Sequence, residues 1–135
     1  DIAEGAGLDL GRYVVVHANS IAERSEQREL ARRGAWLEYD GIAPGTIERH
    51  VELVIQAAED GFSDQVLLSH DAGWYAVGEP NGGTVRGFTC LLDGLVPALS
   101  ARGGGQDLVR QVCCANPARA FAVRRADATT MRSEA

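Results

Sequence analysis

Three short apolar segments alternate with segments of helical periodicity along the chain. The apolar segments span residues 13–17, 35–40 and 65–70. Continuous apolar strands separated by helices are typical of a parallel sheet that helices cover. Because crossovers between parallel strands are right-handed, the three strands are expected to lie side by side in sequence order. The pattern therefore predicts an α/β fold.

Helical segments follow the strands. They are predicted over 21–33, 46–60 and 106–122, and the second carries one continuous apolar stripe. Gly34 and Gly61 directly follow the first two segments, as expected for residues that end helices. The order βα, βα, βα is therefore expected along the chain.

The third strand is followed by a long loop, 71–87, before helical periodicity returns. Phe88 and Leu92 belong to the apolar face predicted for this next helix, and Pro97 should kink or restart it. In the last helical segment, Asn116 precedes a proline and is predicted to be an N-cap. This predicts three βα units plus a C-terminal helix.

Three parallel strands do not form a closed structure. Both edges of such a sheet stay open, and one apolar face lacks helices. A closed (β/α)₈ barrel needs eight strands and about 250 residues, whereas this chain has 135. An open doubly wound sheet would also need more strands, so we expect residues 1–123 to be one part of a larger α/β domain whose N-terminal part is missing, followed by a polar, flexible tail over 124–135.

Composition narrows the function classes. The net charge is −6 without a basic stripe, which makes nucleic acid an unsuitable partner. No apolar run reaches the roughly 20 residues of a membrane span. The chain has no lysine, so lysine-based catalysis cannot occur within it. Cys90, Cys113 and Cys114 fit no disulfide framework and are predicted to be reduced core thiols of a cytoplasmic protein.

Candidate chemistry lies at the carboxyl ends of the strands, where α/β folds place their active sites. His17, Asp40 and Asp71 end the three apolar segments. His17 is either a metal ligand or a core histidine bonded to a backbone carbonyl. Asp71 is either a ligand or a cap of the following turn, since a buried carboxylate requires a cation or several donors.

Other polar residues have less certain roles. Ser69, His70 and Asp71 cannot form a catalytic triad, because consecutive strand residues face opposite sides. His70 is therefore expected either to support a ligand from behind or to have a structural role, and His50 is expected to be a solvated surface residue. Trp74 and the adjacent Tyr75 either line a substrate pocket or pack within a surface loop.

The chain resembles the phosphotriesterase-related family of the amidohydrolase superfamily. The resemblance covers about residues 1–123 and is carried by four motifs: Val14-Val15-Val16-His17, Leu37-Glu38-Tyr39-Asp40-Gly41-Ile42, Leu68-Ser69-His70-Asp71-Ala72-Gly73-Trp74 and Asn116-Pro117-Ala118-Arg119-Ala120-Phe121. It implies a partial (β/α)₈ TIM barrel that contains strands 6–8 and the C-terminal helix.

The resemblance also implies a zinc-dependent hydrolase with two divalent ions in the complete barrel. His17 matches the strand-6 histidine ligand and Asp71 the strand-8 aspartate, which binds metal and accepts a proton from the metal-activated hydroxide. Asp40 then supports the ligands without binding metal itself, and the other four ligands lie upstream. Gly41 replaces the histidine found in triesterases proper, so an ester or lactone is a better substrate than an organophosphate.

Two interpretations follow for the chain as a whole. In the first, it is the C-terminal part of a metal-dependent hydrolase of small esters, lactones or phosphoesters, and is inactive alone. In the second, it is a non-catalytic half-barrel module that binds a partner or assembles as a homo-oligomer.

Overall fold

The computed structural model describes residues 2–123. A parallel sheet of three strands occupies its centre, formed by β1 (Val14–Val15), β2 (Trp36–Tyr39) and β3 (Val66–Leu68). The strands are hydrogen-bonded in the order β1-β2-β3, and Leu37 pairs with both Val15 and Val66. The predicted strand order and parallel direction are confirmed. Each strand is shorter than predicted.

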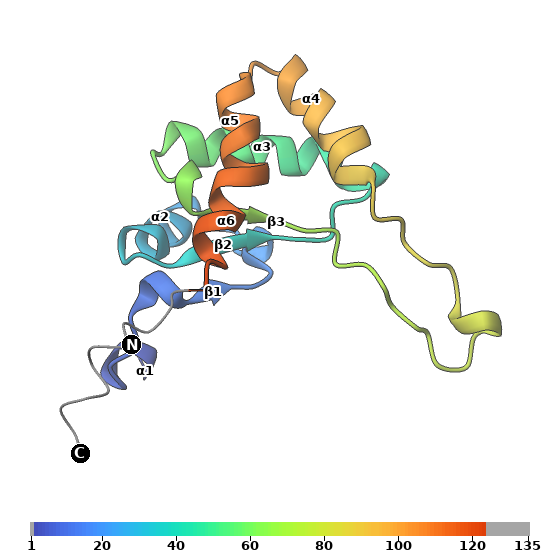
Figure 1. The fold of residues 1–135 in the computed structure, drawn as a ribbon, viewed down its shortest axis with the longest axis horizontal. Coiled ribbons are helices and arrows are strands. Elements are labelled where there is room, and N and C mark those ends of the chain that lie inside the picture. The colour runs from blue at the N-terminus through green and yellow to red at the C-terminus, as the bar shows by residue number, and fades with distance from the viewer. Residues whose placement is uncertain (1, 124–135) are drawn as a thin grey trace.

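In the part of the chain that the structure describes, six α-helices accompany the sheet, and Figure 1 labels them. They are α1 (Ile2–Gly5), α2 (Arg24–Arg32), α3 (Ile47–Glu59), α4 (Val96–Ala101), α5 (Gln106–Arg110) and α6 (Asn116–Ala120). Single 3₁₀ turns occur at Leu10–Arg12, Ala18–Ser20, Pro44–Thr46, Ser63–Gln65 and Pro80–Gly82. Gly34 and Gly61 follow α2 and α3 with φ of +100° and +80°, and their lack of a Cβ makes this left-handed backbone favourable.

A π-helical turn precedes each of the two helical prolines. The turns span Leu91–Leu95 and Gln111–Ala115. Pro97 and Pro117 lack an N–H, and in a regular helix their rings would clash with the carbonyl four residues earlier. The wider turn relieves this clash by shifting the bonds to the fifth residue back. The predicted interruption at Pro97 is thus confirmed.

The predicted N-cap role of Asn116 is wrong. Its backbone is helical (φ −63°, ψ −52°), and its N–H bonds to the carbonyl of Gln111. Its buried side chain instead donates to the carbonyl oxygens of Ser63 and Val66, at 2.7 and 2.8 Å. Asn116 therefore joins the last helix to the start of β3.

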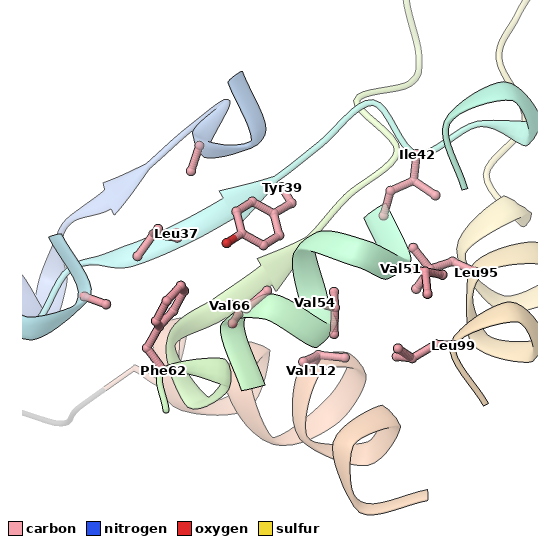
Figure 2. Close-up of a cluster of buried hydrophobic side chains, with 13 residues drawn as sticks. Leu37, Tyr39, Ile42, Val51, Val54, Phe62, Val66, Leu95, Leu99 and Val112 are labelled. Carbon is pink, nitrogen blue, oxygen red and sulfur yellow. The ribbon is translucent and has the colours of Figure 1, made fainter. Parts of the chain in front are cut away.

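The hydrophobic core lies between one face of the sheet and the helices (Figure 2). Leu37, Tyr39 and Val66 point from the sheet toward Val54 of α3 and Val112, and all five are fully buried. Burying one such side chain contributes about 1.5–3 kcal/mol. This core fixes the strands whose carboxyl ends carry the candidate site.

The opposite face of the sheet differs from the prediction. Trp36 and Leu67 alternate with the core residues and so point to this face, yet both are buried. The indole of Trp36 donates to the carbonyl of Gly11 at 3.0 Å, and the guanidinium of Arg119 lies 5.3 Å from the centre of its ring. The expectation of a bare apolar face is therefore wrong.

Several peripheral expectations are also corrected. Phe88 and Leu92 are 61% and 63% exposed, because the helix begins only at residue 91 and turns these side chains outward. Cys114 is exposed rather than part of the core, whereas Cys90 and Cys113 are half-buried, and all three thiols are free. No helix in the described part of the chain could cross a membrane. The tail predicted over 124–135 lies outside the described residues.

Candidate metal centre

His17, Asp40 and Asp71 converge at the carboxyl ends of the three strands. Each offers one potential ligand atom, and these atoms all lie within 4.8 Å of one another. Asp40 is buried, Asp71 is half-buried and His17 is exposed. The predicted convergence of His17 and Asp71 at one end of the sheet is confirmed. Imidazole nitrogen and carboxylate oxygen are donors that zinc accepts.

Two of these residues have an unusual backbone. His17 has φ of +59° and Asp71 has φ of +45°, both in the left-handed region. Such a conformation is uncommon outside glycine and costs on the order of 1–3 kcal/mol. His17 lies two residues after the end of β1, and Asp71 lies three residues after the end of β3. The strained positions therefore coincide with the site.

Asp40 is held by its side chain and by its backbone. Its carboxylate contacts Nδ1 of His17. The Asn19 side chain accepts from the Asp40 N–H at 3.1 Å and donates to its carbonyl at 3.2 Å. Nε2 of His50 lies 2.7 Å from the same carbonyl. Asp40 thus has a fixed backbone from which it can orient the His17 ring.

The prediction that His50 is a solvated surface residue is wrong. It is 2% exposed, and its Nδ1 lies 2.8 Å from the carbonyl of Thr46. Its polar sequence neighbours are misleading, because His50 is three residues after Ile47 and four before Val54 and so shares the buried stripe of α3. That spacing was the signal in the sequence.

Glu38 is a further polar residue of the site that the sequence interpretation did not single out. Burial raises the pKa of its carboxyl, and the neighbouring Asp40 carboxyl raises it further, whereas hydrogen bonds from the Ser69 hydroxyl and the His17 N–H lower it. The sequence signal is the alternation along β2, since Glu38 lies between the core residues Leu37 and Tyr39 and must face the other side.

His70 points away from the ligand cluster. Its Nε2 accepts from the N–H of Leu91 at 2.9 Å, and its ring contacts Phe88 edge-on at 6.5 Å between centroids. This placement matches the expected opposite orientation of adjacent strand residues. His70 joins the end of β3 to the segment that starts the next helix, and so closes the long loop.

The two aromatic residues of the loop have different surroundings. Trp74 donates from its indole to the carbonyl of Asp71 at 2.7 Å, which places it beside the ligand cluster. Tyr75 is 74% exposed, and its ring lies against Gly82, where an added Cβ would come within 2.3 Å of it. The structure thus places only Trp74 near the candidate site.

A mostly apolar cleft of about 340 Å³ opens beside the cluster. Ile42 and Pro44 line it from the loop after β2, and Arg86 and Cys90 from the segment before α4. Nη1 of Arg86 donates to the carbonyl of Asp71 at 3.2 Å. None of the three candidate ligands lines the cleft, and Arg86 links its wall to the backbone of Asp71.

These features agree with the comparisons with known proteins. The profile of the phosphotriesterase family matches residues 1–121, and the chain belongs to this family. An N-acetyltaurine hydrolase from Danio rerio is 28% identical over 132 residues, which cover 87% of this chain and 37% of that protein. The chain thus spans little more than a third of the length of the curated relatives it matches.

Solved structures of related proteins share the fold of this chain. A resiniferatoxin-binding protein from Rhodobacter sphaeroides superposes with a TM-score of 0.75 at 28% identity, covering 90% of this chain and 37% of that one. An organophosphorus hydrolase from Deinococcus radiodurans, at 24% identity, shares the fold with a TM-score of 0.75 over 89% of this chain and 40% of its own. The three parallel strands and their helices therefore match part of the family's TIM barrel.

Proposed function

We propose that this chain forms strands 6–8 and the C-terminal helix of a metal-dependent phosphotriesterase-family hydrolase. The observation that carries the proposal is the convergence of His17, Asp40 and Asp71 within 4.8 Å at the carboxyl ends of three parallel strands. Membership of the phosphotriesterase family supports the proposal. The matched segment spans little more than a third of the relatives' length, which fits three of eight barrel strands. The remaining strands would supply the other ligands.

The donor set fits a divalent ion such as zinc. His17 and Asp71 are the proposed ligands. The Asp40 carboxylate, in contact with Nδ1 of His17, would orient the ring and leave its second nitrogen for the metal. When bound, the metal would polarise the substrate and make water acidic enough to attack at neutral pH.

The residues of the chain itself would handle the proton and the substrate. The Asp71 carboxylate takes up the proton that the attacking water loses and passes it to the leaving group as the bond to that group breaks. Trp74 and Arg86 shape the entrance, and the cleft beside Ile42 and Cys90 accepts the apolar part of the substrate. The proposed bond types are ester, lactone and phosphoester, together with the N-acyl bond that the name of the Danio rerio relative indicates.

Complementation tests this proposal. The portion of the Danio rerio relative that precedes the matched segment is joined to this chain, purified and supplied with zinc. Hydrolysis of N-acetyltaurine, an aryl ester, a lactone and an aryl phosphotriester is then measured. We expect turnover of at least one substrate that chelation abolishes and added zinc restores.

The Asp71→Asn and Asp107→Asn variants are a matched pair for this assay, since Asp107 is exposed on α5 and lies outside the cleft. Both exchange a carboxylate for an amide, but only Asp71 belongs to the ligand cluster. Activity that survives in the Asp71 variant contradicts the proposal. A correctly folded, zinc-loaded assembly without any turnover favours the alternative, a non-catalytic half-barrel module.

A further inference from the structure

We propose that Trp74 and Arg86 are positioning residues that clamp the backbone of Asp71, so that the geometry of this proposed ligand depends on both ends of the long loop 71–87. The inference rests on the proposed function, because it concerns the same ligand cluster. It goes further by assigning a role to two loop residues that are not themselves candidate ligands.

Both residues donate a hydrogen bond to the same carbonyl oxygen. The indole N–H of Trp74 donates to the carbonyl of Asp71 at 2.7 Å, and Nη1 of Arg86 donates to it at 3.2 Å. Nη1 of Arg86 also donates to the carbonyl of His70 at 3.0 Å. A carbonyl oxygen has two lone pairs and Nη1 carries two N–H bonds, so the three hydrogen bonds are compatible. These three bonds make up the clamp.

The clamp meets a specific need of the site. Asp71 has a left-handed backbone, with φ of +45°, and such backbone persists only where the surroundings hold it. One nitrogen of Arg86 can reach the carbonyls of both His70 and Asp71 because they point to the same side. Left-handed backbone brings successive carbonyls to the same side, whereas an extended strand does not. The bonds of Arg86 therefore favour the unusual conformation of Asp71 over an extended one.

The clamp also connects the loop to the site. Figure 1 shows the chain between β3 and α4 projecting away from the sheet and helices. Within residues 75–85, the hydrogen bonds that the structure describes stay inside this segment, and Trp74 and Arg86 directly flank it. Arg86 lines the apolar cleft, and both flanking residues line a second hollow of about 250 Å³. A movement of the loop, or a molecule in either hollow, therefore acts on Asp71 through its two donors.

Nuclear magnetic resonance of the metal-free chain tests the clamp directly. Arg86→Met removes the guanidinium but keeps a long side chain, and Arg86→Lys keeps a cationic donor. We expect Arg86→Met to speed solvent exchange of the Trp74 indole N–H by roughly two- to tenfold, because losing one hydrogen bond loosens the carbonyl that the indole shares with Arg86. Arg86→Lys should restore most of the protection. The indole N–H of Trp36, which donates to Gly11, is the internal control and should not change.

Turnover of the chain joined to the upstream portion of its Danio rerio relative separates positioning from direct contact with the substrate. With metal in excess, Trp74→Phe and Arg86→Met should each lower kcat by roughly two- to tenfold, and the double variant by roughly 10–100-fold, because Asp71 carries the proton. A role in substrate binding alone would raise KM and leave kcat unchanged. Tyr13→Phe and Arg110→Met are matched controls, since both side chains are exposed and lie outside the clamp.

The outcomes distinguish the clamp from the metal centre. Exchange of the Trp74 indole N–H that is unchanged or slower in Arg86→Met overturns the clamp, as does an equal effect on Trp36, which would indicate general loosening. A change in KM alone in both variants overturns the positioning role. If the unaltered assembly shows no zinc-dependent turnover, the proposed function fails instead, and the exchange measurements on the metal-free chain alone decide whether the clamp exists.

Discussion

Replacing Asn116 by Asp should destabilise the chain far more than replacing it by Ala. Asn116 is fully buried, and its amide nitrogen donates to the carbonyls of Ser63 and Val66 at 2.7 and 2.8 Å. Its Oδ1 has no hydrogen-bond partner among the described residues. The amide is therefore held as a double donor.

The magnitudes follow from this bonding pattern. Asn116→Ala loses two hydrogen bonds of about 0.5–1.5 kcal/mol each, partly offset because the unsatisfied Oδ1 is removed as well. A net loss of about 1–2 kcal/mol in the free energy of unfolding is expected. Asn116→Asp places a carboxylate against two carbonyl oxygens, and an uncompensated buried charge costs about 3–5 kcal/mol.

The introduced carboxyl also gives the Asp variant a pH dependence of known sign. Burial would raise its pKa in the folded state above the unfolded value of about 3.9. Its stability relative to the unaltered chain is therefore highest below about pH 4 and falls as the pH rises through the folded-state pKa.

Urea unfolding followed by circular dichroism measures these differences. All variants are compared at one protein concentration, since self-association changes apparent stability. Gln106→Glu is the control, because it makes the same amide-to-carboxylate change at an exposed helix start. Equal stability of the Asp and Ala variants at neutral pH would refute the assignment of Asn116 as a double donor.

Three further predictions concern the site, the core and the edges. In the complemented barrel with metal in excess, Asp71→Asn should lower turnover by about 10²–10⁴-fold. His70→Asn should chiefly lower the thermal midpoint, because it removes the acceptor for the Leu91 N–H. A larger loss of turnover in the His70 variant than in the Asp71 variant would show that the two side chains are assigned to the wrong faces. Burial raises the pKa of Tyr39, whose hydroxyl donates to Gln27 at 2.6 Å. The chain should therefore lose stability as the pH rises above about 10. A Tyr39→Phe variant that loses the same stability over this pH range would exclude Tyr39 as the cause. Within residues 2–123, no further strand pairs with the outer edges of β1 and β3, so the chain alone should self-associate. Sedimentation of a single monomeric species over a wide concentration range would contradict this.

The sequence was sufficient for the order of the fold and for the convergence of the ligands. Apolar periodicity identifies the three strands, and parallel strands must bring their carboxyl ends together, so the sequence alone places His17 and Asp71 at one site. The resemblance in the motifs around Asp40 and Asp71 gave the family. These inferences depend on backbone geometry, which a local pattern largely determines.

The remaining contacts depend on side chains distant in sequence. Asn116 is followed by a proline, as many N-caps are. Only the position of β3 shows that its amide donates to the carbonyls of Val66 and Ser63, which lie 50 and 53 residues earlier in the sequence. His50 lies in the apolar stripe of α3, but its charged sequence neighbours favour the prediction of a surface residue.

The most direct test of the proposed metal centre is anomalous X-ray scattering from zinc. Crystals of this chain joined to the upstream portion of its Danio rerio relative are soaked with zinc, and data are collected at the zinc absorption edge. The proposal predicts a zinc peak about 2.0–2.2 Å from an imidazole nitrogen of His17 and from an Asp71 carboxylate oxygen. Zinc that binds elsewhere, with His17 or Asp71 turned away from it, would contradict the proposal.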